Sequence, residues 1–96
     1  MADSLRDKVA LVTGAGRGIG RAISTTLAKE GARLALTGRN ISRLDQVKSE
    51  IERAQGQADV WQMDVSQESS VGDTVEKIIS DWGQIDILVN NAAIIH

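Results

Sequence analysis

Short apolar segments alternate with longer amphipathic segments along the chain, and this alternation constrains the fold more than any other feature. The short segments are rich in β-branched residues and predict four strands, at residues 9–14, 33–38, 59–65 and 85–91. The longer segments repeat apolar residues every three or four positions and predict three helices, at residues 18–30, 42–54 and 66–82. Strands that alternate with helices form parallel sheets with right-handed crossovers, so the pattern βαβαβαβ predicts an α/β fold with a doubly wound parallel sheet.

The limits of the helices follow from capping residues. Ser42, with Asp45 three positions later, resembles a capping box at the start of the second helix. Ser66 is the expected N-cap of the third helix. Glycines are expected to end the three helices, at Gly31, Gly56 and Gly83.

A doubly wound layout predicts the strand order 3-2-1-4, with the first two helices on one face of the sheet and the third on the other. The fourth strand, within the sequence ILVNNAAII, then forms an apolar edge with little covering one of its faces. Parallel strands are normally covered on both faces, and a free apolar edge favours aggregation. We therefore expect residues 1–96 to form one partial domain, the N-terminal part of a longer protein.

Glycines occupy alternate positions of the stretch TGAGRGIGRA, where the first strand gives way to the first helix. At this point of a doubly wound fold, a helix N-terminus offers N–H groups and a positive dipole end to a dinucleotide pyrophosphate. The spacing T-G-x-x-x-G-x-G is carried by Thr13, Gly14, Gly18 and Gly20. Glycines suit this turn because side chains would hold the phosphates away, and the absence of a following Gly-Lys-Ser/Thr excludes a P-loop. The alternative is a glycine-rich turn without a ligand, in which Gly16 only fills the loop.

A second motif, NNAA at residues 90–93, follows the fourth strand. The first and fourth strands are neighbours in the expected order, and their carboxyl ends flank the place where ligands bind in doubly wound sheets. Two amides and two small residues at this place predict hydrogen bonds to the backbone and to a ligand. An asparagine-rich strand exit without a ligand is the alternative.

Together, the segments ALVTGAGRGIGRA, MDV and WGQIDILVNNAA resemble the short-chain dehydrogenase/reductase family, of the kind typified by 3-oxoacyl-[acyl carrier protein] reductase, from Lys8 onward. The resemblance implies a Rossmann-type sheet and an oxidoreductase that interconverts a ketone or 3-oxoacyl group and an alcohol by hydride transfer. It also implies a small carbonyl or alcohol substrate for the full-length protein, and a homo-oligomer, either a dimer or a tetramer.

The same resemblance implies contacts with a nicotinamide dinucleotide. Gly14, Gly18 and Gly20 would shape the pyrophosphate turn, and Ile19 would lie against the cofactor.

Further contacts are implied on the adenine side of the cofactor. Asp64 would bond the adenine amino group, Val65 would line the adenine pocket, and Asn90 would lie near the adenine-side ribose. Thr13 would brace the turn against the segment around Ala92, which is itself an expected cofactor contact.

The end of the second strand predicts which nicotinamide cofactor is bound. NAD-binding sites place an acid there to hold the ribose 2′-hydroxyl, whereas this chain has Gly38 followed by Arg39. A guanidinium attracts a 2′-phosphate and can bind it with two hydrogen bonds, and Arg17 in the glycine stretch can reach the same group. The sequence therefore predicts NADP rather than NAD. The alternative is that both arginines are solvated surface charges.

The resemblance also shows what this chain lacks. The family uses a tyrosine as proton donor, a lysine four residues later and a serine that orients the substrate, but this sequence has no tyrosine. We therefore expect the 96 residues alone to be inactive and to form the cofactor-binding part of a longer reductase. A non-catalytic truncated module for nucleotide binding or protein interaction is the alternative. An extended sugar-nucleotide epimerase is disfavoured, because Arg17 stands where that motif has glycine.

Composition argues against several other classes of protein. The net charge of −2 provides no broad basic field for nucleic acid or an anionic membrane. The sequence has no apolar run of membrane-spanning length and no signal peptide, which predicts a cytoplasmic protein. It has no cysteine, which excludes disulfides and thiolate metal sites.

Overall fold

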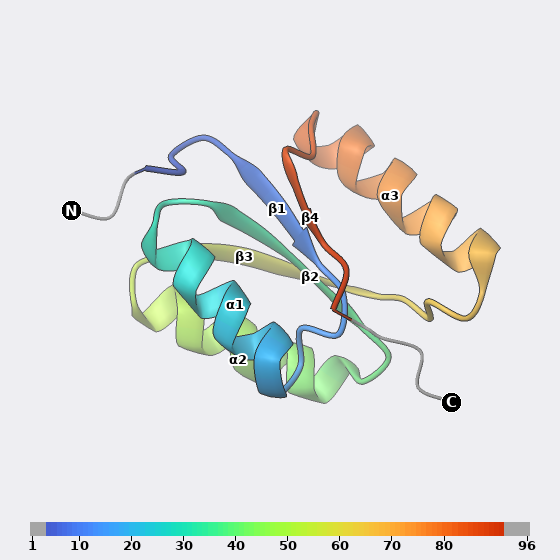
Figure 1. Cartoon of the computed structure of the whole chain (residues 1–96), viewed down its shortest axis with the longest axis horizontal. Helices are drawn as coiled ribbons and strands as arrows, with labels where there is room; N and C mark the ends of the chain where they lie inside the picture. The colour runs from blue at the N-terminus through green and yellow to red at the C-terminus, as the bar shows by residue number, and fades with distance from the viewer. Residues whose placement is uncertain (1–3, 92–96) are drawn as a thin grey trace.

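The computed structural model describes residues 4–91, which form one parallel sheet with helices on both faces (Figure 1). In chain order the elements are β1 (Val9–Val12), α1 (Gly18–Lys29), β2 (Arg33–Gly38), α2 (Ile41–Arg53), β3 (Gln57–Gln62), α3 (Glu68–Trp82) and β4 (Ile87–Val89). The strands lie in the order β3-β2-β1-β4, and every pair is parallel. The predicted α/β class and strand order are confirmed.

The sheet separates two apolar layers, because successive strand residues point to opposite faces. On one face α2 buries Leu44, Val47 and Ile51 against strand residues, with α1 beside it. On the other face α3 places Ile78 over Leu11 and Ala35. Figure 1 shows α1 and α2 on one side of the sheet and α3 on the other, as the doubly wound layout predicts.

The third strand lies earlier in the chain than predicted. β3 pairs with β2 from Gln57, opposite Arg33, to Gln62, opposite Gly38, so it ends where its neighbour ends. Met63 still donates its N–H to the Gly38 carbonyl at 2.8 Å, but Asp64 and Val65 lie beyond the strand, in the loop that leads to α3. The predicted limits of 59–65 were wrong because pairing with β2, and not hydrophobicity, fixes the register.

Two predicted N-caps were also wrong. The N-cap of α2 is Asn40, whose side chain accepts a hydrogen bond from the Arg43 N–H at 3.1 Å, so Ser42 lies inside the helix. The N-cap of α3 is Gln67, while the Ser66 hydroxyl donates to the Asp64 carboxylate instead. Asparagine caps helices as well as serine does, and Asn40 has the extended backbone directly before α2 that an N-cap requires.

The helix ends agree better with the sequence. Gly31 and Gly83 have left-handed backbones, with φ of 98° and 83°, directly after α1 and α3. After α2 this conformation falls on Gln55, with φ of 71°, rather than on Gly56. Among residues 4–91, no helix is both long enough and apolar enough to cross a lipid bilayer.

Candidate functional site

The turn after β1 is fastened to the exit of β4. The Thr13 N–H donates to the Val89 carbonyl at 3.0 Å, and the Asn91 N–H donates to the Thr13 hydroxyl oxygen at 2.9 Å. The same hydroxyl lies 3.3 Å from Asn90 Oδ1. The expected brace from Thr13 is therefore formed with Asn90 and Asn91, whereas Ala92, named in the same expectation, lies outside the described residues.

Gly20 lies where the first turn of α1 packs directly on this loop. A Cβ atom at Gly20 would stand well inside van der Waals distance of the Gly14 carbonyl oxygen and 2.6 Å from Asn91 Nδ2. Asn91 Nδ2 also lies 3.3 Å from the Gly14 carbonyl oxygen, to which it donates. No side chain fits at the buried Gly20, so the glycine lets the first turn of α1 pack directly on the loop after β1.

Gly18 and Ile19 are the first two residues of α1, and both are exposed. Gly18 has a left-handed φ of 59°, and a Cβ there would meet nothing within 4 Å, so conformation and not space requires the glycine. Ile19 is 71% exposed. The first turn of α1 has no side-chain cap and no acidic residue. The end of this helix therefore presents a positive dipole beside an apolar surface.

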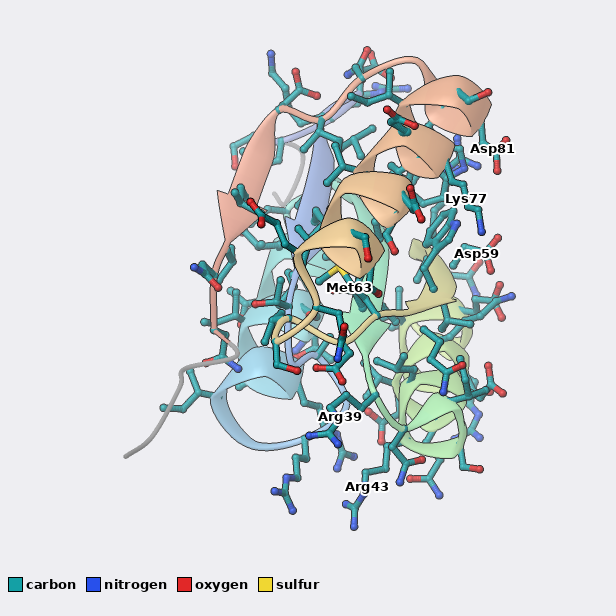
Figure 2. The ribbon with its side chains drawn as sticks, turned by 90° about the vertical axis from the view of Figure 1, so that its right-hand side faces the viewer. Arg39, Arg43, Asp59, Met63, Lys77 and Asp81 are labelled. Atoms are coloured by element: carbon teal, nitrogen blue, oxygen red, sulfur yellow. The ribbon has the colours of Figure 1, made fainter. Side chains whose placement is uncertain are left out.

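A hollow of about 460 Å³ lies between the glycine turn, the end of β2 and the start of α2. Its lining comprises Gly14, Gly16, Arg17, Gly38, Arg39, Asn40, Arg43, Leu44, Met63 and Val65. Three of these residues are arginines and none is acidic, while Leu44, Met63 and Val65 supply an apolar part. Figure 2 shows Arg39 and Arg43 projecting at the same end of the molecule, with Met63 further inside, near the first turns of α3.

Asp64 lies beside this hollow, in a smaller one that shares Arg39 and Met63 with it. Asp64 Oδ1 accepts hydrogen bonds from the Ser66 hydroxyl at 2.7 Å and the Ser66 N–H at 3.0 Å. These bonds lower the pKa of Asp64 below its ordinary value, and the charge of Arg39, whose Nε lies 4.0 Å from Oδ2, lowers it further. Asp64 is therefore ionised at neutral pH.

The structure brings most of the sequence-predicted site residues to one end of the sheet. Gly14, Arg17, Arg39 and Val65 line the main hollow, and Asp64 lines the adjoining one. Gly18, Ile19 and Gly20 begin α1 next to the turn, and Asn90 follows β4. Figure 1 shows the carboxyl ends of β1, β2 and β4 at this same end of the molecule.

Sequence reasoning missed two residues of the site. Arg43 lies in the first turn of α2, close in sequence to Arg39, and the run of basic residues after β2 was the available signal. Asn91 bonds the Gly14 carbonyl, but the sequence offered nothing to separate its role from that of Asn90. No group of three or more potential metal-ligating side chains occurs within residues 4–91.

The strand order and the glycine turn at the first crossover define a Rossmann-type α/β protein. The short chain dehydrogenase family model matches residues 8–96, and the chain belongs to this family of oxidoreductases, whose members bind a nicotinamide cofactor.

Three similar proteins illustrate the relationship. A short-chain dehydrogenase/reductase homolog of Bacillus subtilis, YusS, is 47% identical over 89 residues, which cover 92% of this chain and 82% of that protein. An uncharacterized oxidoreductase of Staphylococcus saprophyticus is 46% identical over 94% of this chain and 39% of its own length. The crystal structure of a metagenomic short-chain oxidoreductase in complex with NADP superposes with a TM-score of 0.92 at 41% identity, over 95% of this chain and 41% of that one. The chain thus spans less than half the length of the second and third.

Proposed function

We propose that residues 1–96 are a partial dinucleotide-binding domain, the NADP-binding part of an oxidoreductase that interconverts a ketone or 3-oxoacyl group and an alcohol by hydride transfer. One observation carries the proposal: arginines surround a hollow beside the glycine turn, and no acid lines it. A carboxylate in that hollow would favour the 2′-hydroxyl of NAD, whereas guanidinium groups favour the 2′-phosphate of NADP. The relative crystallised with NADP supports the same cofactor.

The residues present fit a dinucleotide. The glycine at position 20 seats the first turn of α1 directly on the glycine turn, so the exposed N-terminus of α1 would face a pyrophosphate there. Gly14 and Gly18 give the turn its left-handed positions, and exposed Ile19 would cover the cofactor. Arg17 and Arg39 would bind the 2′-phosphate.

The adenine end would lie on the side of α3. Val65 and Met63 would line the adenine pocket, and the ionised Asp64 would accept a hydrogen bond from the adenine amino group. Asn90 would bond the adenine-side ribose, and Ala92 would contact the cofactor nearby.

When bound, NADPH supplies the hydride, and this chain holds and orients the cofactor. The resemblance assigns proton transfer to a tyrosine, and these 96 residues contain none. The proposal therefore gives the chain cofactor binding and leaves substrate binding to the full-length protein. That protein would act in the cytoplasm as a homodimer or homotetramer on a small carbonyl or alcohol substrate.

Titration calorimetry of the chain with NADP and NAD tests the cofactor. We expect NADP to bind about tenfold or more tightly than NAD, since charge-assisted hydrogen bonds to a phosphate are the stronger contacts. Gly38→Asp is the matched variant for the opposite preference, because a Cβ there would touch the Leu44 side chain at ordinary contact distances, 3.4 Å at the nearest. We expect it to favour NAD. Failure to bind either nucleotide would refute the proposal.

A second candidate is a non-catalytic nucleotide-binding or interaction module. The Bacillus subtilis relative favours it, because the segment that matches this chain makes up 82% of that protein. Assays of the full natural gene product with NADPH and small ketones separate the candidates. NADPH oxidation that requires a ketone supports the reductase, while tight NADPH binding without turnover supports the module.

A further inference from the structure

The first turn of α2, which carries Arg43, packs against the glycine turn. A Cβ at Gly16 would lie 3.0 Å from the Arg43 Cβ and 3.7 Å from the Leu44 backbone nitrogen, so the loop rests on the first turn of α2. The Arg43 N–H donates to the Asn40 cap, and the next residue, Leu44, is fully buried. The base of the Arg43 side chain is therefore fixed, while its guanidinium is free to turn into the hollow that it lines.

The charges of the three arginines are not equivalent. Among residues 4–91, salt bridges to acids involve Arg21, Arg39 and Lys48, and neither Arg17 nor Arg43 takes part in one. Arg39 Nε lies 4.0 Å from the Asp64 carboxylate, and its side chain is 79% exposed. The nearby carboxylate offsets part of the charge that Arg39 offers to an anion, whereas Arg43 keeps its full charge.

We propose that Arg43 binds the 2′-phosphate of NADP together with Arg17 and Arg39, and that it is a determinant of the preference for NADP over NAD. This inference rests on the proposed function. A 2′-phosphate carries up to two negative charges near neutral pH, and Arg17 together with an Arg39 that is shared with a carboxylate does not fully balance them. Arg43 supplies a further cation from the first turn of α2, where the Asn40 cap and the buried Leu44 hold the backbone. The same contact explains Gly16, whose missing side chain lets the loop reach α2.

Replacement of Arg43 by glutamine tests the inference. Calorimetric titration of the chain with NADP and with NAD gives the ratio of the two dissociation constants for each variant. We expect Arg43→Gln to weaken NADP binding about tenfold and to change NAD binding less than about twofold, because NAD has no phosphate at this position. Arg53→Gln is the matched control, since Arg53 is an exposed arginine in the last turn of the same helix, and it leaves both constants unchanged.

The outcomes separate this inference from the proposed function. If the wild-type chain binds neither nucleotide, the proposed function fails. If the wild type prefers NADP but Arg43→Gln weakens both nucleotides equally, or neither, Arg43 has no role in the preference and the inference is overturned. Thermal melts establish that each variant is folded. If the glutamine variant unfolds, Arg43→Met is the second test. Methionine keeps an unbranched side chain at this position and removes the charge, so we expect the same selective loss of NADP affinity.

Discussion

Gly20 is the residue at which one added methyl group has the sharpest expected effect. In Gly20→Ala the new Cβ would collide with the Gly14 carbonyl and stand 2.6 Å from Asn91 Nδ2, so the turn must open. We expect a loss of about 1–3 kcal/mol in the free energy of unfolding and no measurable NADP binding. Chemical denaturation and calorimetry measure the two effects.

Gly72→Ala is the matched control for this substitution. Gly72 lies within α3, and a Cβ there would meet nothing within 4 Å. Alanine is the better helix former, so this variant should gain about 0.5–1 kcal/mol and bind NADP as the wild type does. Equal stabilities for the two variants would contradict the close packing of the turn.

Asp86 directly precedes β4 and is hydrogen-bonded to the first residue of β1. Its charge should make the free energy of unfolding depend on pH. Its carboxylate accepts the Val9 N–H at 2.8 Å, and this bond, with a second from Gln84, lowers the pKa of Asp86. A pKa lower in the folded than in the unfolded chain means that ionised Asp86 stabilises the fold above its ordinary pKa, and that this contribution disappears as the pH falls through the folded value.

Asp86→Asn should therefore lose less stability than the wild type between about pH 5 and pH 3. Thermal melts across this range measure the difference. Asp73→Asn is the matched control, since Asp73 lies exposed on α3 without a hydrogen bond or salt bridge among the described residues. If stability falls equally with decreasing pH in the wild type and in Asp86→Asn, the charge of Asp86 adds nothing to the stability of the fold.

The sequence predicts single residues well where their role depends on the local conformation of the backbone. Gly14 lies in the turn after β1, Gly18 and Gly20 lie at the start of α1 beside it, and Arg39 follows β2. Arg43 and Asn91 were missed because their contacts, with Gly16 and Gly14, join segments on different elements. Such contacts depend on how the crossovers pack, which spacing along the chain does not contain.

In the first turn of α2, the effect of a substitution on the stability of the fold can be separated from its effect on the proposed preference for NADP. Asn40 caps the helix through its Oδ1 and also lines the hollow. Asn40→Asp keeps the cap and adds a favourable charge at the helix N-terminus, so stability should hold or rise by a few tenths of a kcal/mol. The new carboxylate would repel a 2′-phosphate by about 1–2 kcal/mol at an effective dielectric near 20, which weakens NADP about tenfold.

Asn40→Ser and Asn40→Ala complete this test. Serine is a neutral cap and should leave NADP binding intact, whereas alanine removes the cap and costs about 1 kcal/mol of stability. Denaturation and calorimetry give both quantities for each variant. If Asn40→Asp binds NADP as well as the serine variant does, no phosphate lies near this helix end.

Element order and the limits of β2 could be predicted from the sequence, but the limits of β3 could not. The alternation of strand and helix patterns suffices for the β3-β2-β1-β4 sheet, because parallel crossovers leave few arrangements. The end of β3 at Gln62 is fixed by pairing with β2, which removes Asp64 and Val65 from the strand and places them in the loop beside the hollow. Tertiary pairing therefore decides which residues the site receives.

Within residues 4–91 the sheet ends at β3 on one side and at β4 on the other, and the β4 edge is apolar. Among the described residues β4 pairs only with β1, and Leu88 lies opposite Leu11, so it faces the side of the sheet that carries α3. Yet Leu88 remains 65% exposed, and Ile79 of α3 is 47% exposed. An apolar strand with a free edge pairs readily with other chains. The 96-residue chain should therefore self-associate as its concentration rises.

Leu88→Lys should suppress this association, because a charged side chain at an edge opposes pairing between sheets and removes a buried leucine from each contact. The loss of about 1–2 kcal/mol per leucine would raise the concentration at which association begins about tenfold. Light scattering over a concentration series measures the onset. Gln46→Lys adds the same charge to the exposed face of α2 and is the control for a general effect of net charge. If both lysine variants shift the onset equally, charge and not the β4 edge governs association; a shift confined to Leu88→Lys identifies β4 as the surface through which the chains meet.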